Sequence, residues 1–397
     1  MRLLIVEPHD SGHHAHYVRW LVQAAVRKRW NVVIATTSAA LSHPLLKTIA
    51  ADFAGVDTHL IEGFPAIDGP ESRALRLLRR EFSYWRIFRA LAAEMRARSA
   101  IDAAVLPYVD YCFHVLSILG SPFGALPWCG ISMRLQVMQR TDTGAPWLPF
   151  KWRIARRILR GAALRALFVI NPSIQDLPAR WLPRALLAKL QYLPDPAEPP
   201  ARGSRGESRS SWRILDAQIV ILVFGSLDAR KGIDSLLAAV TSRAQFDNCV
   251  ILLAGKLSED VRGQLRREPS YVSLVEMRRL IVIDRVVTDD ELDSVFAAAD
   301  IVWVGYRSHA YMSGVLALAG RAGIAVLGTS EGEIGRLIAK ERIGAAARID
   351  RPAEVVAALS SMLDVRTRLE MGQRASAAFA GHTTEGFGDR VMAVLGG

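Results

Sequence analysis

The sequence predicts an α/β protein made of two domains, each with a doubly wound parallel sheet. Short apolar runs rich in valine, isoleucine and leucine recur along the chain, and helical patterns separate them. The length of 397 residues suits two domains. Residues 191–212 are rich in proline, glycine, serine and charge, which is typical of a linker. We therefore expect a first domain over 1–190, a linker over 191–212 and a second domain over 213–375.

Strand and helix patterns alternate through the first domain. Apolar runs predict strands at 2–7, 31–35, 57–61, 102–106, 126–131 and 166–170. Helical patterns lie at 15–27, 41–51, 73–98 and 147–165. This alternation is typical of a Rossmann-like domain with a parallel sheet.

The second domain repeats the same organisation. Its strands are expected at 219–224, 249–253, 280–283, 301–304 and 324–327. Its helices are expected at 233–240, 258–267, 289–299, 331–340, 352–363 and 366–395. Residues 376–397, at the end of the last helix, are expected to return to the first domain.

Cysteine content and hydropathy exclude several protein classes. No apolar run approaches the ~18 residues that cross a bilayer, and the first residues lack the shape of a signal peptide. Cys112, Cys129 and Cys249 lie far apart, which argues against a disulfide framework or a zinc site. We expect a cytoplasmic protein without a bound metal.

Most of the net charge of +11 lies in the first 199 residues. The segments 73–98 and 147–165 interleave arginines with aromatic side chains, which suits an anionic lipid surface. A solvated charged face is the alternative interpretation. Nucleic acid is not expected as a partner, because no recognition motif accompanies the charge. We therefore expect peripheral contact with the inner face of a membrane.

In the first domain, candidate site residues follow two of the expected strands. Gly12, His13 and His14 come after the first strand, and Asp110 comes after the strand at 102–106. The carboxyl ends of parallel strands are where such sheets bind ligands. A histidine or aspartate there can act as a base, and Gly12 lets a ligand approach the backbone. An ordinary helix-start turn with surface histidines is the alternative.

In the second domain, the turn after the strand at 219–224 is the strongest candidate for an anion site. It contains Gly225 and Ser226, followed by the adjacent cations Arg230 and Lys231. Small residues at the end of a strand with a cation beside a helix start form a clamp for a diphosphate. A structural turn with solvated charges is the alternative.

Two later turns complete the predicted site. Tyr306, Ser313, Gly314 and Val315 follow the strand at 301–304, where unpaired amides of a starting helix favour phosphate. After the strand at 280–283, the backbone of Arg285, Val286 and Val287 is a candidate contact for a nucleobase. The Thr288 and Glu291 pair that follows predicts a capping box, which is a structural role.

These residues resemble the donor domain of GT-B glycosyltransferases, in particular the retaining family 4, also called group 1. The family pattern G-R-L-x-x-x-K-G-x-x-x-L-L is matched by Gly225, Leu227, Lys231, Gly232, Leu236 and Leu237, with Ser226 in place of the arginine. The segments 289–302 and 318–327 are also similar. The paired glutamates of the family, spaced E-x7-E, are absent, because Ala310 and Leu318 stand at those positions.

The resemblance implies two Rossmann-like domains that face each other across a cleft. It implies transfer of a sugar, hexosyltransferase-like, from a UDP- or GDP-sugar to a glycan or lipid-linked acceptor, as in the synthesis of cell-surface polysaccharide or glycolipid. Lys231 and the amides of Ser313–Val315 would hold the donor phosphates, and Arg285–Val287 would lie near the base. No metal or other cofactor is expected. A catalytically inactive partner or scaffold protein and an epimerase-like hydrolase remain the alternatives.

Overall fold

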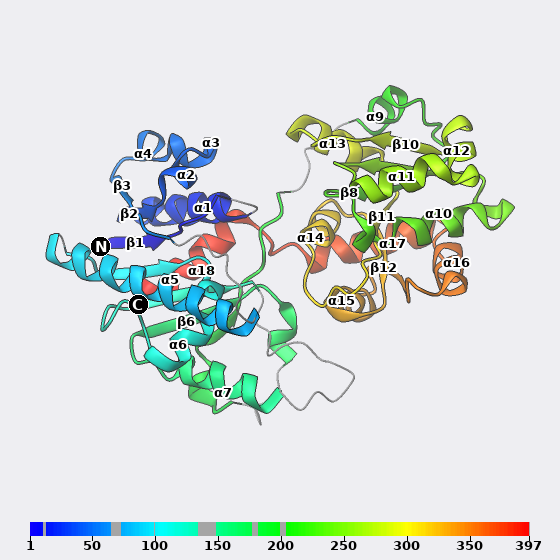
Figure 1. Ribbon diagram of the computed structural model, residues 1–397. Coiled ribbons are helices and arrows are strands. Elements are labelled where there is room, and N and C mark those ends of the chain that lie inside the picture. Colours follow the sequence, from blue (N-terminus) through cyan, green and yellow to red (C-terminus); the bar gives the residue numbers. More distant parts are fainter. Residues whose placement is uncertain are drawn as a thin grey trace. The chain divides into compact units, whose positions relative to one another are not determined.

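The computed structural model describes residues 1–10, 13–64, 73–98, 100–133, 148–176, 182–198 and 204–396. The chain forms two compact units (Figure 1). The first contains Met1–Pro194 and Thr384–Gly397, and the second contains Asp195–Thr383. Each unit has one parallel sheet, so the predicted α/β class is confirmed.

The first unit is built on a seven-stranded parallel sheet in the order β3-β2-β1-β4-β5-β6-β7. Its strands are β1 (Arg2–Val6), β2 (Asn31–Thr36), β3 (Val56–Leu60), β4 (Ala103–Leu106), β5 (Trp128–Ser132), β6 (Leu164–Val169) and β7 (Leu190–Tyr192). Its helices are α1 (His14–Arg27), α2 (Ser38–Leu41), α3 (Pro44–Lys47), α4 (Ile49–Asp52), α5 (Arg73–Arg98), α6 (Phe113–Leu119), α7 (Leu148–Leu159), α8 (Arg184–Leu187) and α18 (Thr384–Gly396).

Two hydrophobic cores cover the two faces of this sheet. Successive strand residues point to opposite faces, so Leu4 joins the core under α5, α6 and α7. Its neighbour Leu3 joins the core under α1 and α18. The ring of Phe387 on α18 lies 4.8 Å from the ring of Tyr17 on α1. Helix α18 is therefore part of the first unit, although the chain reaches it after the whole second unit.

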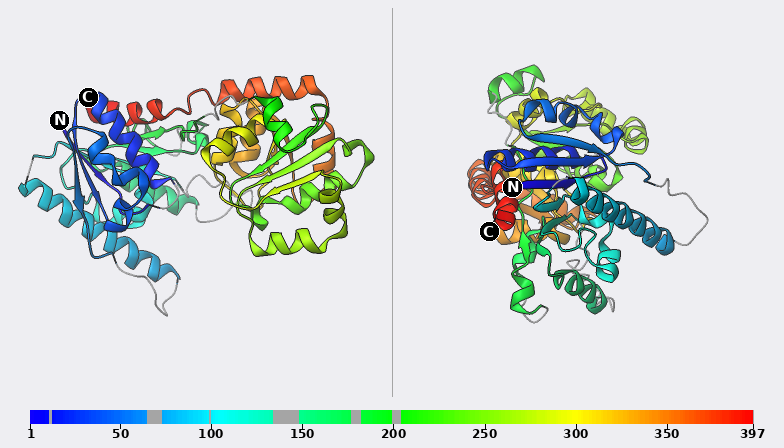
Figure 2. Two further views of the ribbon diagram at one scale, coloured as in Figure 1. Left: turned by 90° about the horizontal axis from the view of Figure 1, so that it is seen from above. Right: turned by 90° about the vertical axis from the view of Figure 1, so that its left-hand side faces the viewer.

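The second unit has a six-stranded parallel sheet in the order β10-β9-β8-β11-β12-β13. Its strands are β8 (Ile219–Phe224), β9 (Cys249–Ala254), β10 (Leu280–Ile283), β11 (Ile301–Val304), β12 (Ala325–Thr329) and β13 (Gly344–Ala347). Its helices are α9 (Arg205–Ser211), α10 (Ile233–Thr241), α11 (Glu259–Arg267), α12 (Pro269–Glu276), α13 (Asp289–Ala298), α14 (Gly314–Arg321), α15 (Gly332–Glu341), α16 (Pro352–Ser360) and α17 (Val365–Ala378). Helices cover both faces of the sheet (Figure 2).

Three predicted helices differ from the structure. The helix expected at 41–51 is broken into α2, α3 and α4, because Pro44 starts a new turn after the cap residue His43. The segment 147–165 is helical only to Leu159, and β6 begins at Leu164. The helix expected at 366–395 is divided into α17 and α18, between which the chain passes from the second unit to the first.

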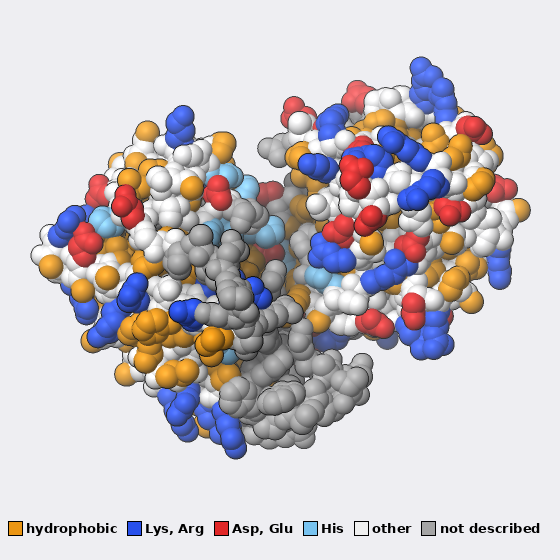
Figure 3. Space-filling model, in the orientation of Figure 1, with side chains coloured by type: hydrophobic (Ala, Val, Ile, Leu, Met, Phe, Trp, Pro, Cys, Tyr) orange, Lys and Arg blue, Asp and Glu red, His pale blue; other side chains and the backbone are white. Residues whose placement is uncertain are grey.

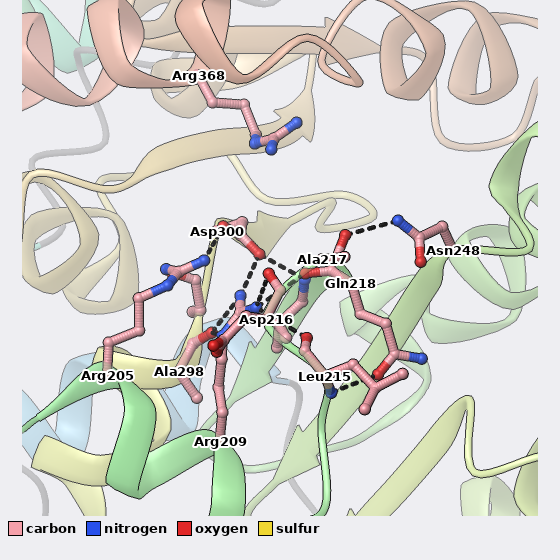
Figure 4. Close-up of polar contacts among 12 residues, drawn as sticks. Arg205, Arg209, Leu215, Asp216, Ala217, Gln218, Asn248, Ala298, Asp300 and Arg368 are labelled. Atoms are coloured by element: carbon pink, nitrogen blue, oxygen red, sulfur yellow. Dashed lines mark hydrogen bonds and ion pairs between the residues drawn. The ribbon is translucent and has the colours of Figure 1, made fainter.

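The predicted linker, 191–212, is also partly regular structure. Tyr192 ends β7, and α9 forms at Arg205–Ser211. A buried ion pair explains this helix (Figure 4). The side chain of Arg209 is fully buried and donates at 2.6 Å to Asp300, which precedes β11. Arg209 also donates to the backbone carbonyls of Ala298, Leu215, Asp216 and Gln218.

The substitution Arg209→Met should destabilise the second unit. Removing one partner of a buried pair typically costs about 3–5 kcal/mol, because the other partner and the carbonyls lose their donor. Arg205 is a matched control, because it binds the other oxygen of Asp300 at 2.6 Å and its side chain is 48% exposed. Arg205→Met should cost about 1 kcal/mol or less. Hydrogen exchange of the β8 and β11 amides measures both changes, and equal losses would contradict the central role of Arg209.

Candidate functional site

The predicted site residues of the second unit lie along one edge of its sheet. Strands β10, β9, β8 and β11 are neighbours and run parallel, so the turns that follow them meet at their carboxyl ends. Gly225 to Lys231 follow β8, Arg285 to Val287 follow β10, and Tyr306 to Val315 follow β11. The chain crosses from β10 back over the sheet to β11, so the switch point lies between β8 and β11, where ligands bind such domains.

Lys231 is the central cation of this edge. Its ammonium donates at 2.6 Å to the carbonyl of Phe224 and at 3.0 Å to the hydroxyl of Tyr306. It also lies 4.7 Å from the centroid of the Tyr306 ring. The hydroxyl of Ser313 donates to that of Tyr306 at 3.2 Å. These contacts link the end of β8 with the start of α14.

Two glycines allow the backbone to place Lys231 there. Gly225 has a φ of 96°, and a Cβ at this position would lie 3.4 Å from the Lys231 ammonium. Gly232 has a φ of 59°, and its Cβ would lie 2.5 Å from the carbonyl oxygen of Gly305. The indole N–H of Trp303 donates to the Lys231 carbonyl at 2.6 Å. The left-handed turns and this bond hold the lysine in one position.

The start of α14 combines a cap with open space. Ser313 is buried, and its hydroxyl accepts a hydrogen bond from the backbone N–H of Leu316. Apart from its own turn of the helix and its two chain neighbours, no described part of the chain has a heavy atom within 4 Å of a Cβ added to Gly314. Val315 is half-buried on the adjoining core and lies beside Gly225. The first amides of the helix therefore adjoin space that an anion can fill, close to the cation of Lys231.

Arg230 is placed differently from Lys231. Its guanidinium forms an ion pair with Asp228 at 2.6 Å, and its side chain is 75% exposed. The carboxylate of Asp228 raises the pKa of Arg230 through this hydrogen bond. Ser226 is exposed in the same turn. The structure thus unites Lys231, Tyr306 and Ser313, while the side chain of Arg230 is held by its own turn.

The turn after β10 has a defined structural framework. Arg285 forms an ion pair with Glu291. The hydrogen bonds that Glu291 accepts from Arg285 and from the backbone N–H of Thr288 lower its pKa to about 2. The predicted capping box of Thr288 and Glu291 is confirmed. Val286 is 76% exposed, and Val287 packs against the core that also contains Tyr306. The exposed groups of this turn therefore include the paired Arg285 side chain as well as the apolar side chain of Val286.

The positions of the absent glutamates have structural roles of their own. Leu318 lies on α14 and is half-buried against the core. The carbonyl of Ala310 accepts from the backbone N–H of Glu333 at 3.3 Å. Glu333 itself is buried and forms an ion pair with Arg336. Its carboxylate is thus already engaged, whereas Glu331 is exposed at the start of α15.

A second polar cluster lies at the carboxyl end of β1 in the first unit, centred on Glu7. Glu7 is fully buried and accepts at 2.6 Å from the hydroxyl of Tyr111 and at 3.0 Å from the backbone N–H of His9. Its other oxygen lies 3.0 Å from Nδ1 of His14. The distance is that of an ion pair, but this oxygen of Glu7 accepts no hydrogen bond from the described residues.

Aromatic rings complete the cluster around Glu7. The rings of Tyr84 and Tyr111 stack with centroids 5.0 Å apart, and Nε2 of His9 lies 2.6 Å from the Tyr84 hydroxyl. Burial, together with the charge of Glu7, strongly raises the pKa of Tyr111. Burial lowers the pKa of His9. Both shifts favour the neutral forms, in which these groups can relay hydrogen bonds around the carboxylate.

The structure separates the predicted residues of the first unit. His14 joins the Glu7 cluster, with Nδ1 also 3.0 Å from the Tyr111 hydroxyl. His13 is exposed before α1, and Gly12 lies outside the described residues. Asp110 accepts from the Ser132 hydroxyl and the Met133 backbone N–H, both at 2.8 Å. These bonds give the Asp110 carboxylate a structural role at the end of β5, which weakens it as a candidate base.

Several residues of these sites were missed by the sequence reasoning. The Glu7 cluster draws on distant segments, which contribute His9, Tyr84 and Tyr111. Trp303 acts through its indole N–H, which binds the backbone carbonyl of Lys231. One signal was present, because Glu7 is a charged residue directly after the apolar run at 2–6. A charge that ends a buried parallel strand lies at the edge where ligands bind.

The described part of the chain has neither a metal-ligand cluster nor a membrane-spanning helix. No group of three or more histidine, cysteine, aspartate or glutamate side chains there is arranged to hold a metal ion. None of the helices found in that part is both long and apolar enough to cross a bilayer. Cys112, Cys129 and Cys249 are buried free thiols, and burial raises the pKa of each.

Comparisons with known proteins agree with this architecture. The family model of glycosyl transferases group 1 matches residues 218–364, which make up most of the second unit. None of the curated proteins matches the chain. Among solved structures, Anabaena HepE in complex with UDP has a TM-score of 0.68 at 12% sequence identity, with all of both chains covered.

Two further structures resemble the whole chain. Sucrose-phosphate synthase from Thermosynechococcus elongatus has a TM-score of 0.66 at 16% identity, covering 99% of this chain and 98% of its own. WaaG, a glycosyltransferase involved in lipopolysaccharide biosynthesis, has a TM-score of 0.60 at 14% identity, with all of both chains covered. The second unit of this chain therefore matches the group 1 glycosyltransferases in sequence, and the two units together have the GT-B fold.

Proposed function

We propose that the protein is a glycosyltransferase that takes a sugar from a UDP- or GDP-sugar donor. The observation that carries this proposal is the position of Lys231, whose ammonium is fixed between the end of β8 and the start of α14. A diphosphate bound there would contact the ammonium and the amides of Ser313, Gly314 and Val315. The group 1 match and the UDP in the HepE structure support a nucleotide as the ligand.

The same arrangement accounts for the chemistry of the leaving group. Negative charge grows on the diphosphate as the bond to the sugar breaks, and a prearranged cation with oriented amides stabilises that charge. Lys231 supplies the cation without rearrangement, because its contacts already fix it. We propose that the reaction proceeds in this way without a metal ion. The backbone at Gly225, Ser226 and Arg285–Val287 would line the remainder of the nucleotide, and Arg230 would assist from its exposed position.

The acceptor is proposed to bind the first unit near Glu7 and His14. Nδ1 of His14 faces Glu7 and Tyr111, so Nε2 is the nitrogen that can take a proton from an acceptor hydroxyl. The carboxylate of Glu7 would stabilise the imidazolium that forms, and it acts as a positioning residue. Gly12 and His13 adjoin His14 in sequence and would border the acceptor. Such a base is needed if the transfer inverts the configuration of the sugar. If the configuration is retained, the donor phosphate can take the proton of the acceptor hydroxyl instead.

The acceptor is proposed to be a glycan or a lipid-linked sugar at the inner face of a membrane, in cell-surface polysaccharide or glycolipid synthesis. Arginines on α5 and α7 favour an anionic surface, and Arg153, Arg157 and Arg160 are exposed. WaaG, which has a similar fold, is described as acting in lipopolysaccharide biosynthesis. The enzyme would then be a hexosyltransferase that is peripheral to the membrane and cytoplasmic.

An inactive partner protein with this fold is the second candidate. Ala310 and Leu318 at the positions of the paired glutamates favour it. Donor turnover separates the two candidates. An active enzyme releases nucleoside diphosphate from its donor, whereas an inactive partner binds without turnover.

The substitution Lys231→Ala should weaken nucleotide binding. Hydrogen bonds to charged groups contribute about 1.5–3 kcal/mol, so UDP or GDP affinity should fall by roughly tenfold to a hundredfold. Calorimetric titration with each nucleotide measures the loss. Arg230→Ala is the matched control, because it removes the adjacent cation that Asp228 holds, and it should cost fivefold or less, about 1 kcal/mol. Unchanged binding in Lys231→Ala would remove the proposed donor site.

The substitution His14→Ala should reduce the transfer rate by about 10²–10⁴-fold if His14 is the base. Nucleotide affinity should stay within about twofold, because His14 belongs to the other unit. His13→Ala, at an exposed position, should lower the transfer rate by less than about tenfold. A tenfold change corresponds to about 1.4 kcal/mol, as expected for a peripheral contact. Steady-state kinetics with the identified donor measures these rates. Equal small effects at both positions would rule out a histidine base.

A further inference from the structure

A groove in the first unit lies between α5, α6 and α7, and none of its lining residues belongs to the Glu7 cluster. Its volume is about 770 Å³, within the range of ~300–1,000 Å³ that is typical of small-molecule sites. Its apolar side chains include Leu77 and Leu78 from α5, Ile118 from α6 and Ile154 from α7. Four arginines on α7 and directly after it also line the groove, namely Arg153, Arg156, Arg157 and Arg160.

The groove is built on a rigid framework. Glu81 of α5 is buried and accepts from the backbone N–H groups of His114 at 2.7 Å and Val115 at 3.1 Å. It also forms an ion pair with Nδ1 of His114 at 2.6 Å. The other end of α6 is held by the Trp85 indole, which donates to the Gly120 carbonyl at 2.8 Å. Both ends of α6 are thus fixed to α5, and the groove exists without a ligand.

Large apolar side chains extend from the groove onto the surface. Ile118 is 67% exposed, and Leu78, Phe82 and Leu119 are each between 42% and 47% exposed. Hydrophobic side chains gather over α5 and α6, with basic side chains close by (Figure 3). Exposed apolar patches of this kind mark surfaces that contact a partner or a membrane.

The described charged side chains that line the groove are all basic. Arg153, Arg157 and Arg160 are exposed, and no acidic residue is among the described residues that line the groove. Arginines bind phosphate through paired N–H groups, and the adjoining apolar floor suits a hydrocarbon chain. The ligand that satisfies both parts is an amphiphile with an anionic head.

We propose that this groove binds an anionic membrane lipid, with an acyl chain along α6 and the phosphate on the arginines of α7. This inference rests on the proposed peripheral membrane contact and adds a specific lipid site to it. It does not depend on donor binding, because the groove lies in the first unit and Lys231 lies in the second. The lipid would hold the first unit on the membrane by both its charge and its apolar chain.

Vesicle sedimentation of the full chain tests the proposal. The protein should bind vesicles of phosphatidylcholine mixed with phosphatidylglycerol and should bind pure phosphatidylcholine vesicles at least tenfold more weakly. Each arginine near an anionic surface changes binding by about fivefold, so Arg157→Gln with Arg160→Gln should weaken it by about 25-fold. Arg243→Gln with Arg266→Gln removes the same charge from exposed positions of the second unit and should leave binding within about twofold.

The apolar floor needs a test of its own. Ile118→Gln keeps the charge and should weaken binding several-fold, and high salt should not abolish the difference between this variant and the wild-type protein. Inorganic phosphate in molar excess over lipid should not displace the protein. Equal binding by Ile118→Gln and wild type, or full displacement by phosphate, would overturn the lipid groove.

A separate readout distinguishes this proposal from the donor site. Lys231→Ala should bind anionic vesicles like the wild-type protein, and Arg157→Gln with Arg160→Gln should leave UDP affinity within about twofold. If anionic vesicles are not bound while UDP is, the lipid groove is wrong and the donor site stands. If vesicles are bound while no nucleotide is, the donor site is wrong and the lipid groove stands.

Discussion

Parallel strands place all their carboxyl ends at one edge of a sheet, and both candidate sites depend on this constraint. In the second unit it brings Lys231, Tyr306 and Ser313 together, although 82 residues of sequence separate the first from the last. In the first unit it brings Glu7 from the end of β1 to Tyr111 after β4. The connecting segments carry different side chains to that edge.

The two edges have opposite electrostatic character. A cation is fixed at the edge of the second unit, where its hydrogen bonds are to neutral oxygens of Phe224 and Tyr306. A buried carboxylate is fixed at the edge of the first unit, where it faces a histidine and a tyrosine. In the proposed reaction, the former would attract the anionic part of the donor, and the latter would favour loss of a proton from the acceptor hydroxyl. The two edges thus supply different steps of the proposed group transfer.

The fold was predictable because it depends on local patterns. Apolar runs located most of the strands, whereas β7 and β13 were missed, since GAAA at 344–347 lacks branched side chains and β7 has three residues. The site was predictable where a residue acts through its place in a turn, as Lys231 does beside two glycines. It was not predictable where partners come from distant segments. Nothing local to Asp110 shows that Ser132 and Met133 bind its carboxylate, or that Asp300 holds Arg209 inside the presumed linker.

The position of α18 has a consequence for synthesis on the ribosome. Phe387, Val391 and Met392 belong to the same core as Leu3 and Val18, so the first unit lacks part of its interior until residues 384–396 have been made. The second unit, at 195–383, is complete before then. During translation, the unit that emerges first is therefore the one that finishes folding last. Until then, the part of the α1-side core that α18 covers lacks its packing partner.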